Sequence, residues 1–591
     1  MKYSSEASVI TENFLPDTSK VAPEEVKRLI RDVQYELTAA WKFFMGLGID
    51  RQALIFANGF TTLPLAIARN CSHVIVHGLR EKEQELLRTV AVSKQISNYT
   101  CVEDVSNLAT QFDVIIFTTT NLGDAPAFPS KHDVSRLIGR KSEVWMVTTN
   151  ERSVSFAKRA AKTLWWKTKS PHDRKRRNAL EGVRFQFGEK QPMLSKQAKS
   201  YLETIDCKPF SQIAVAPTVI NAEVVRTLTG PRNQAVNGHL GPTWRKFVSE
   251  DVVIGASRGS AGMSFLQRLL HHLPRTDLMD GKVSKYMISP GGKVLVFAKF
   301  DQRGDTRNAL LKLPLNATTT IKMAKNYRLL KMLATTEHVG YSRRGFFPEP
   351  LAEGSFENQA YFVEGILSGK SGDILKAPKS ENDRLAHEIF SFWSSVQESL
   401  SRSYFFDEPT FDKFISEPLK DAFDFLGFEG EHETMRERIE EYLKERFLNQ
   451  AFNLSIIHGD FSDKNIIFDE PTLTLKGVID WDMAREMAFP ILDVMHYFVR
   501  SHRISYSKSP VKLLHTMIFE KKLIPEYFPS IVNMYEESFK LDKSFLGPLI
   551  IVYWMHRAAG HFGTLKNLDK SFVRRNFTEP LKIFERILSE S

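Results

Sequence analysis

Residues 456–484 combine carboxylate and amide side chains at a spacing that can transfer a phosphoryl group. They read IIHGDFSDKNIIFDEPTLTLKGVIDWDMA, in which Asp460 and Asn465 are followed, after a strand-like run, by Asp480. One Asp near a substrate hydroxyl, with an Asn and a further Asp that hold Mg²⁺, is the minimum set for moving the γ-phosphoryl group of ATP. Oxygen ligands of this kind suit Mg²⁺, which also bridges the phosphates.

The same segment resembles a known family. HGDxxxxN followed by GxIDWxxA is similar to the signature of the aminoglycoside phosphotransferase and choline kinase family, relatives of the protein kinases. The resemblance implies that Asp460 orients the substrate hydroxyl and accepts its proton. It implies that Asn465 and Asp480 bind Mg²⁺, and that His458 fixes the catalytic loop. The expected function is therefore ATP- and Mg-dependent phosphorylation of a hydroxyl on a small molecule or glycan.

Two further acidic residues and two alternatives belong to this interpretation. Asp482 is a candidate to assist the metal, and Asp493, in ILDVMHY, resembles the family's acidic residue that braces the catalytic loop.

One alternative is that HGD and DWD are ordinary polar turns, which would require two spaced motifs to arise by chance. The other is a kinase fold without catalysis, a non-catalytic scaffold; the intact Asp460, Asn465 and Asp480 argue against it. Protein kinase activity is disfavoured because the acidic motif reads I-D-W in place of D-F-G and no A-P-E follows it in the sequence.

The expected ATP site draws on residues before this segment. Lys312, in the apolar run ALLKLPL, is the candidate that pairs the ATP phosphates, and Lys299, one strand earlier, is its competitor. Ser289-Pro290-Gly291-Gly292 joins two strands where a phosphate-covering loop would lie, and Gly291 and Gly292 would let backbone N–H groups approach the phosphates. A plain hairpin turn is the alternative.

The run AYFVEG is expected to form the hinge between two lobes of a kinase-like domain. Val363, Glu364 and Gly365 would offer backbone groups to adenine, and Ile366, the next residue, completes this set. The family would also place a Glu in the following helix, paired with the lysine. Asn326 stands there instead, and it can hydrogen-bond an ammonium group but cannot pair its charge. The sequence thus predicts an unusual ATP site.

The first part of the chain alternates strand-like and helix-like runs. Apolar β-rich runs spaced by helices predict an α/β domain with a doubly wound parallel sheet. The expected strands are 53–57, 73–78, 114–120, 144–149, 183–187 and 211–217, with helices at 24–46, 64–69, 81–96 and 194–204. The rest predicts an α+β kinase-like domain, with strands at 286–290, 293–300, 309–315 and 360–365 and a helix at 321–334.

The first domain is similar to the class I S-adenosylmethionine-dependent methyltransferases, with weakened cofactor motifs. Its glycine-rich turn keeps only Gly59, and its second strand ends in His77, Gly78 and Leu79 where an acid would bind the ribose. The favoured interpretation is a sheet retained as a scaffold, with S-adenosylmethionine binding doubtful. A bifunctional kinase-methyltransferase is the alternative.

These expectations divide the chain into segments. They are a tail at 1–23, a methyltransferase-like domain at 24–224, a linker at 225–250 and a kinase-like domain at 251–591, with a small lobe at 251–365 and a large lobe at 366–591. A chain of 591 residues exceeds what one hydrophobic core usually serves.

Composition adds the cellular setting. The net charge of +10 favours anionic ligands such as nucleotides, and no nucleic-acid-binding motif is present. Three scattered cysteines indicate neither a disulfide framework nor a zinc site, which fits a reducing cytoplasm. The sequence predicts no signal peptide and no transmembrane segment. It does not identify the acceptor or the oligomeric state.

Overall fold

The fold is taken from a computed structural model. It describes residues 42–57, 63–93, 95–118, 131–149, 201–216, 224–229, 251–259, 263–273, 279–289, 292–302, 305–315, 317–335, 345–371, 379–426, 431–469, 472–506, 509–522, 527–561 and 579–589. The chain divides into two compact units, one made of residues 1–320 with 352–363 and the other of residues 321–351 with 364–591. Each unit is described by itself.

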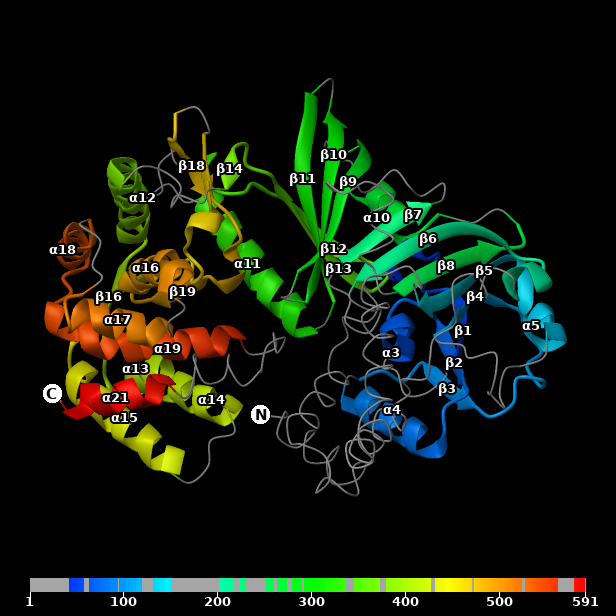
Figure 1. The fold of residues 1–591 in the computed structure, drawn as a ribbon, viewed down its shortest axis with the longest axis horizontal. Coiled ribbons are helices and arrows are strands. Elements are labelled where there is room, and N and C mark those ends of the chain that lie inside the picture. The colour runs from blue at the N-terminus through cyan, green and yellow to red at the C-terminus, as the bar shows by residue number, and fades with distance from the viewer. Residues whose placement is uncertain are drawn as a thin grey trace, which may run out of the picture. The chain divides into compact units, whose positions relative to one another are not determined.

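In the described part of the first unit, eight strands form one sheet in the order β3-β2-β1-β4-β5-β8-β6-β7 (Figure 1). The strands are β1 (Gln52–Phe56), β2 (His73–His77), β3 (Tyr99–Val102), β4 (Phe112–Phe117), β5 (Ile138–Thr149), β6 (Lys208–Ala216), β7 (Val224–Thr229) and β8 (Asp251–Ser257). Strands β1 to β5 pair in parallel. Ala53, Leu54 and Ile55 in the central strand β1 are fully buried, as both faces of a covered parallel sheet should be.

This strand order confirms the predicted doubly wound α/β fold. The chain moves outward from β1 to β3, returns, and then moves the other way through β4 and β5, so that the direction reverses between β1 and β4. Helices α3 (Leu63–Ala68), α4 (Glu81–Ser93) and α5 (Lys131–Leu137) lie between the strands in sequence. The predicted helix 24–46 falls mostly, and the predicted strand 183–187 wholly, outside the described residues.

The end of this sheet differs from the sequence-based domain boundaries. Residues 224–229, at the start of the expected linker, form β7. Residues 251–257, expected to begin the kinase-like domain, form β8, which lies antiparallel between β5 and β6. The prediction missed β8 because its partners β5 and β6 are distant in the chain and leave no local signal, whereas β7 forms a hairpin with the preceding strand β6, a local pairing that the prediction overlooked.

A second sheet follows in the order β12-β13-β11-β10-β9. Its strands are β9 (Met279–Ser289), β10 (Lys293–Gln302), β11 (Asp305–Pro314), β12 (Pro350–Phe356) and β13 (Gln359–Gly365). The hairpin succession β9, β10, β11 agrees with the predicted strands, and β12 was not predicted. Most of this sheet belongs to the first compact unit, and the division between units passes between Val363 and Glu364, within the predicted hinge.

The second unit is mainly helical (Figure 1). Its helices include α11 (Ala317–Thr335), α12 (Lys379–Ser399), α14 (Glu417–Leu426), α15 (Glu431–Phe447), α16 (Ile491–Tyr506), α17 (Pro510–Ile518), α18 (Phe528–Phe539), α19 (Leu546–His561) and α21 (Glu579–Ser589). Short strands carry the predicted site, namely β15 (Arg402–Phe405), β16 (Ala451–Ile457), β17 (Ile466–Phe468), β18 (Leu475–Val478) and β19 (Arg485–Ala488). No helix within the described ranges has the length and apolar character needed to cross a membrane.

Candidate active site

Asp460 lies in a loop that leaves the buried strand β16. Ile456 and Ile457 end that strand in the core, and a 3-10 turn, Asp463–Asn465, leads into β17. Gly459 has φ +75°, and a Cβ placed on it would lie 2.2 Å from the carbonyl oxygen of Met483. Only glycine therefore fits between His458 and Asp460 without moving the backbone.

The buried carboxylate of Asp493, at the start of α16, braces this loop. Its Oδ2 accepts from the backbone N–H of His458 at 2.7 Å and from Nε1 of Trp393 at 2.9 Å. Its Oδ1 accepts from the backbone N–H of Gly459 at 2.9 Å. Burial raises the pKa of Asp493, and these donors oppose that rise. The bracing contacts expected from the family resemblance are thus present.

His458 has both ring nitrogens occupied by the backbone of the same site. Nε2 lies 2.8 Å from the carbonyl oxygen of Ile479, and Nδ1 lies 3.3 Å from the backbone N–H of Asp460. A carbonyl can only accept and an N–H can only donate, so Nε2 is the donor and Nδ1 the acceptor of this ring. His458 therefore ties the Asp460 loop to the Asp480 segment, as expected for a residue that fixes the loop.

The residues that follow the two aspartates anchor them in one aromatic cluster. Phe461 and Trp481 are buried, and both rings pack on Trp393, with centroids 5.4 and 5.6 Å away. Asp460 and Asp480 each immediately precede one of these rings in the chain. Packing of the neighbouring rings therefore limits how far either carboxylate can move from the other.

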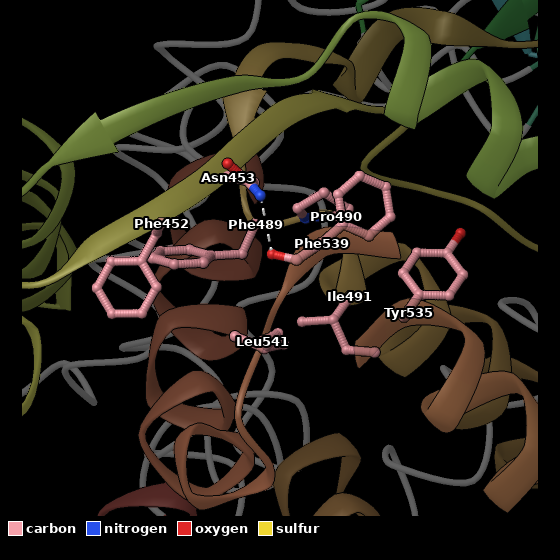
Figure 2. Close-up of a pocket in the computed structure, with 8 residues that line it drawn as sticks. All are labelled: Phe452, Asn453, Phe489, Pro490, Ile491, Tyr535, Phe539 and Leu541. Carbon is pink, nitrogen blue, oxygen red and sulfur yellow. Dashed lines mark hydrogen bonds between the residues drawn. The ribbon is translucent and has the colours of Figure 1, made fainter. Parts of the chain in front are cut away.

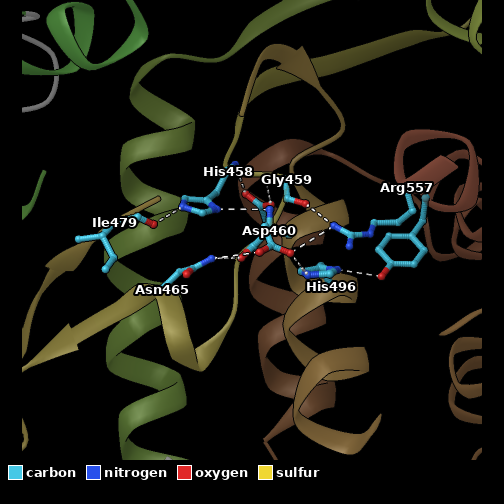
Figure 3. A network of polar contacts seen from close by, with 9 residues as sticks. His458, Gly459, Asp460, Asn465, Ile479, His496 and Arg557 are labelled. Atoms are coloured by element: carbon cyan, nitrogen blue, oxygen red, sulfur yellow. Dashed lines mark hydrogen bonds and ion pairs between the residues drawn. The ribbon is translucent and has the colours of Figure 1, made fainter. Parts of the chain in front are cut away.

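A hairpin brings the expected metal ligands to the same end of β17 and β18. Ile466 pairs with Val478, and the N–H of Ile479 donates to the carbonyl of Asn465 at 2.8 Å. Asp480 follows in a left-handed conformation, φ 63° and ψ 63°, with its side chain exposed. Asn465 donates its Nδ2 to Asp460, at 2.8 Å to the main-chain oxygen and 3.2 Å to Oδ2 (Figure 3).

The oxygen atoms that Asn465 and Asp480 supply are of the kind that Mg²⁺ prefers. Because Nδ2 of Asn465 is used by Asp460, its Oδ1, the atom that binds a metal, has no hydrogen-bond partner among the described residues. The described residues contain no group of three or more His, Cys, Asp or Glu side chains that could hold a metal. One amide and one carboxylate oxygen suit Mg²⁺, which keeps waters and phosphate oxygens as its other ligands.

The other oxygen of Asp460 has two partners that sequence reasoning missed. Oδ1 lies 3.0 Å from Nε2 of His496 and 3.3 Å from Nη1 of Arg557 (Figure 3). Nδ1 of His496 lies 2.9 Å from the hydroxyl of Tyr553. His496 is three residues after Asp493, so the two share one face of α16, and this spacing was an available signal. Arg557 and Tyr553 come from α19, far along the chain, and had no local signal.

These contacts set the charge states of Asp460 and His496. Burial would raise the pKa of Asp460, but the hydrogen bond from His496 and the charge of Arg557 hold it well below its ordinary value. Burial and the nearby Arg557 charge lower the pKa of His496 to about 4, against the pull of Asp460. At neutral pH the pair is a carboxylate that accepts from a neutral imidazole.

The residues of the expected ATP site occupy different environments. Lys312 on β11 is buried, whereas Lys299 on β10 is exposed, which favours Lys312 as the functional lysine. Gly292, with φ +76°, follows the turn between β9 and β10, and Gly291 lies outside the described residues. Glu364 is buried and Ile366 is exposed.

Asn326, at the place of the expected acid, is buried in α11. Its Nδ2 has no hydrogen-bond partner among the described residues. An amide nitrogen cannot accept from a lysine, so this atom does not replace the missing carboxylate.

The first sheet presents few cofactor-binding groups where its strand order reverses. Residues 58–62, which include Gly59, lie outside the described residues. At the end of β2, the His77 ring lies 3.2 Å from the carbonyl oxygen of Val102, and Gly78 has φ +93° with its Cβ position 2.3 Å from the carbonyl oxygen of Ala57. His77, Gly78 and Leu79 thus stand at the strand end where the family's acid would bind the ribose.

A small pocket in the second unit is separate from this site (Figure 2). It contains no carboxylate, imidazole or ammonium group and none of the expected catalytic residues. Its lining consists of Phe452, Asn453, Phe489, Pro490, Ile491, Tyr535, Phe539 and Leu541. We interpret it as a packing defect of an aromatic core.

A braced aspartate loop beside a hairpin with an Asn and an Asp defines a kinase-like phosphotransferase domain. The family model "Phosphotransferase enzyme family" matches residues 302–510, so this part of the chain resembles that family. The resemblance inferred from the HGD and GVIDWD motifs is confirmed. A search of curated proteins found no match.

Solved structures similar to the chain cover both parts. An aminoglycoside-3'-phosphotransferase of type VIII is 16% identical over 50% of this chain and 97% of its own, with a TM-score of 0.31. A SAM-dependent methyltransferase from Thermotoga maritima, described as a possible histamine N-methyltransferase, is 13% identical over 42% and 98%, with a TM-score of 0.26. WbdD is 10% identical over 88% and 89%, with a TM-score of 0.24. These TM-scores are too low to support a fold assignment, so the assignment rests on the observed strand order.

Proposed function

We propose that the chain is an ATP- and Mg²⁺-dependent phosphotransferase that acts on a hydroxyl group of a small molecule or glycan. The observation that carries this proposal is the hydrogen-bonded unit of Asp460 and Asn465, joined through the β17–β18 hairpin to Asp480. The family match over residues 302–510 supports the same class of reaction.

The roles follow from the contacts. Asp460, ionised at neutral pH, accepts a hydrogen bond from the acceptor hydroxyl and orients its oxygen for attack on the γ-phosphorus. The hydroxyl oxygen forms the new P–O bond, ADP leaves, and the hydroxyl proton passes to Asp460 or to solvent as the bond forms. Asn465 and Asp480 would hold Mg²⁺, which neutralises charge on the phosphates. Lys312 would pair with the ATP phosphates, the backbone at Gly291 and Gly292 would cover them, and residues 364–366 would meet adenine.

The test is release of ADP measured against a panel of sugars, amino alcohols and aminoglycosides. We expect Asp460→Asn to lower the rate by about 10²- to 10⁴-fold, because the amide lacks the negative charge that accepts a hydrogen bond from the acceptor hydroxyl and orients it. Asp421→Asn, which changes an exposed carboxyl on α14, is the control and should keep the wild-type rate. Full activity in Asp460→Asn would disprove the mechanism.

A further inference from the structure

Arg557 approaches the catalytic aspartate with only one of its nitrogens. Nη1 donates to the main-chain oxygen of Gly459 at 3.0 Å and to Oδ1 of Asp460 at 3.3 Å. Within the described residues, Nη2 and Nε have no hydrogen-bond partner, and neither atom is among the buried polar atoms that lack one. Since the side chain is 23% exposed, these donors are open to a ligand while the guanidinium stays anchored.

The donors around Asp460 also define where the acceptor hydroxyl binds. Each carboxylate oxygen accepts two hydrogen bonds in its plane. Oδ1 receives both of its donors from His496 and Arg557, whereas Oδ2 receives one, from Asn465. The acceptor hydroxyl therefore binds Oδ2 of the carboxylate whose Oδ1 contacts Arg557, so the guanidinium lies near the bound acceptor.

A second arginine adds to the positive charge on this side of the site. Arg500 lies one helical turn after His496 on α16, and its charge, like that of Arg557, lowers the pKa of the His496 ring. Arg500 has no ion-pair partner among the described residues. Arg557 thus contacts the ionised carboxylate, and Arg500 adds positive charge near His496, the other partner of the same oxygen.

We infer that the acceptor carries an anionic group, a phosphate or a carboxylate, near the hydroxyl that is phosphorylated, and that Arg557 binds this group. The inference deepens the proposed function and rests on it. A guanidinium suits both anions, because two parallel N–H groups match two of their oxygens. A cationic acceptor would meet repulsion from Arg557 and Arg500.

The competing role for Arg557 is to stabilise the transferring γ-phosphoryl group itself, as arginines do in other phosphotransferases. The two roles predict different results. An arginine for the acceptor sets which acceptors bind, whereas an arginine for the γ-phosphoryl group sets the rate with every acceptor, including water.

The experiment is calorimetric titration of the full chain, held at saturating Mg·ADP, with glucose 6-phosphate, glucuronate and glucose. We expect at least one of the two anionic sugars to bind about tenfold or more tightly than glucose, and their comparison separates phosphate from carboxylate recognition. Arg557→Gln should remove this preference, and Arg557→Lys should retain part of it. Arg586→Gln, which removes the same charge from an exposed position on α21, should bind as the wild type does.

Every other result overturns the inference. Equal binding of glucose and both anions, no binding of either anion, or an anion preference that survives in Arg557→Gln contradicts a role for Arg557 in acceptor recognition. If Arg557→Gln slows acceptor-independent ATP hydrolysis tenfold and leaves the sugar preference unchanged, the γ-phosphoryl role is correct. Where Arg557→Gln fails to fold, Arg557→Lys keeps the charge but loses the paired N–H groups, so it should weaken the preference, and an undiminished preference in that variant would overturn the inference. Failure of Mg·ADP to bind in the same titration would instead refute the proposed phosphotransferase.

Discussion

Asp460 is a weak base by construction, because its Oδ1 is occupied by His496 and Arg557. Loss of those donors would raise its pKa and free the carboxylate to rotate. The two donors therefore lower the basicity of Asp460 and at the same time fix its orientation. This suits phosphoryl transfer, in which a loose transition state needs little proton abstraction before the new bond forms. The main contribution of Asp460 is then to aim the acceptor oxygen.

His496 makes the stability of the protein depend on pH. Its folded pKa of about 4 lies below the ordinary 6.5, so the unfolded state takes up a proton first as the pH falls. Stability should therefore decrease from about pH 6.5 downward, by roughly 2 kcal/mol at pH 5. The stabilisation from Asp460, whose pKa is also lowered, persists through this window and is lost only at lower pH.

Urea unfolding at pH 7 and pH 5 measures this effect. His496→Gln, which keeps a donor toward Asp460, should show a smaller loss of stability between the two pH values. His387→Gln, at an exposed histidine of α12, is the control and should behave as the wild type. Identical pH dependence in all three proteins would show that His496 does not titrate as a buried neutral group.

At the scale of elements, the loop after β16 is held by backbone shape as well as by hydrogen bonds. Gly459→Ala would force a Cβ against the Met483 carbonyl at a positive φ. We expect a loss of about 1–3 kcal/mol in stability and at least a tenfold drop in phosphotransfer, because the Asp460 and Asp480 segments would separate. Gly345→Ala, which meets no atom within 4 Å, is the matched control.

Thermal unfolding and ADP release measure both effects. A Gly459→Ala protein with normal activity would mean that the loop tolerates a shift between its two acidic segments.

At the scale of the whole molecule, the two nucleotide-type folds should respond differently to their ligands. Mg·ATP should raise the unfolding temperature, since a ligand at 100 times its Kd stabilises by about 2.7 kcal/mol. S-adenosylmethionine should leave it unchanged, because β2 ends in His77 and Gly78 without an acid for the ribose. A clear shift with S-adenosylmethionine would overturn the scaffold interpretation of the first sheet.

The sequence predicted features that are local and missed those that depend on distant pairing. Strands β1, β2, β4 and β5 follow from short apolar runs, and the Asp460 and Asp480 segments from a compact motif. The contacts of Arg557 with Asp460 join positions almost a hundred residues apart and depend on how α19 packs. Likewise β8 was assigned to the wrong domain, because its partners β5 and β6 precede it across long intervening segments.

The position of β8 affects folding during synthesis and the choice of boundaries for protein fragments. Because this strand lies between β5 and β6, the first sheet cannot close until the ribosome has released residue 257, after every other strand of that sheet. Until then β5 and β6 each present an unpaired edge, a site for aggregation or chaperone binding. A fragment cut at 250 would keep that defect permanently, whereas one that extends beyond Ser257 would carry all eight strands.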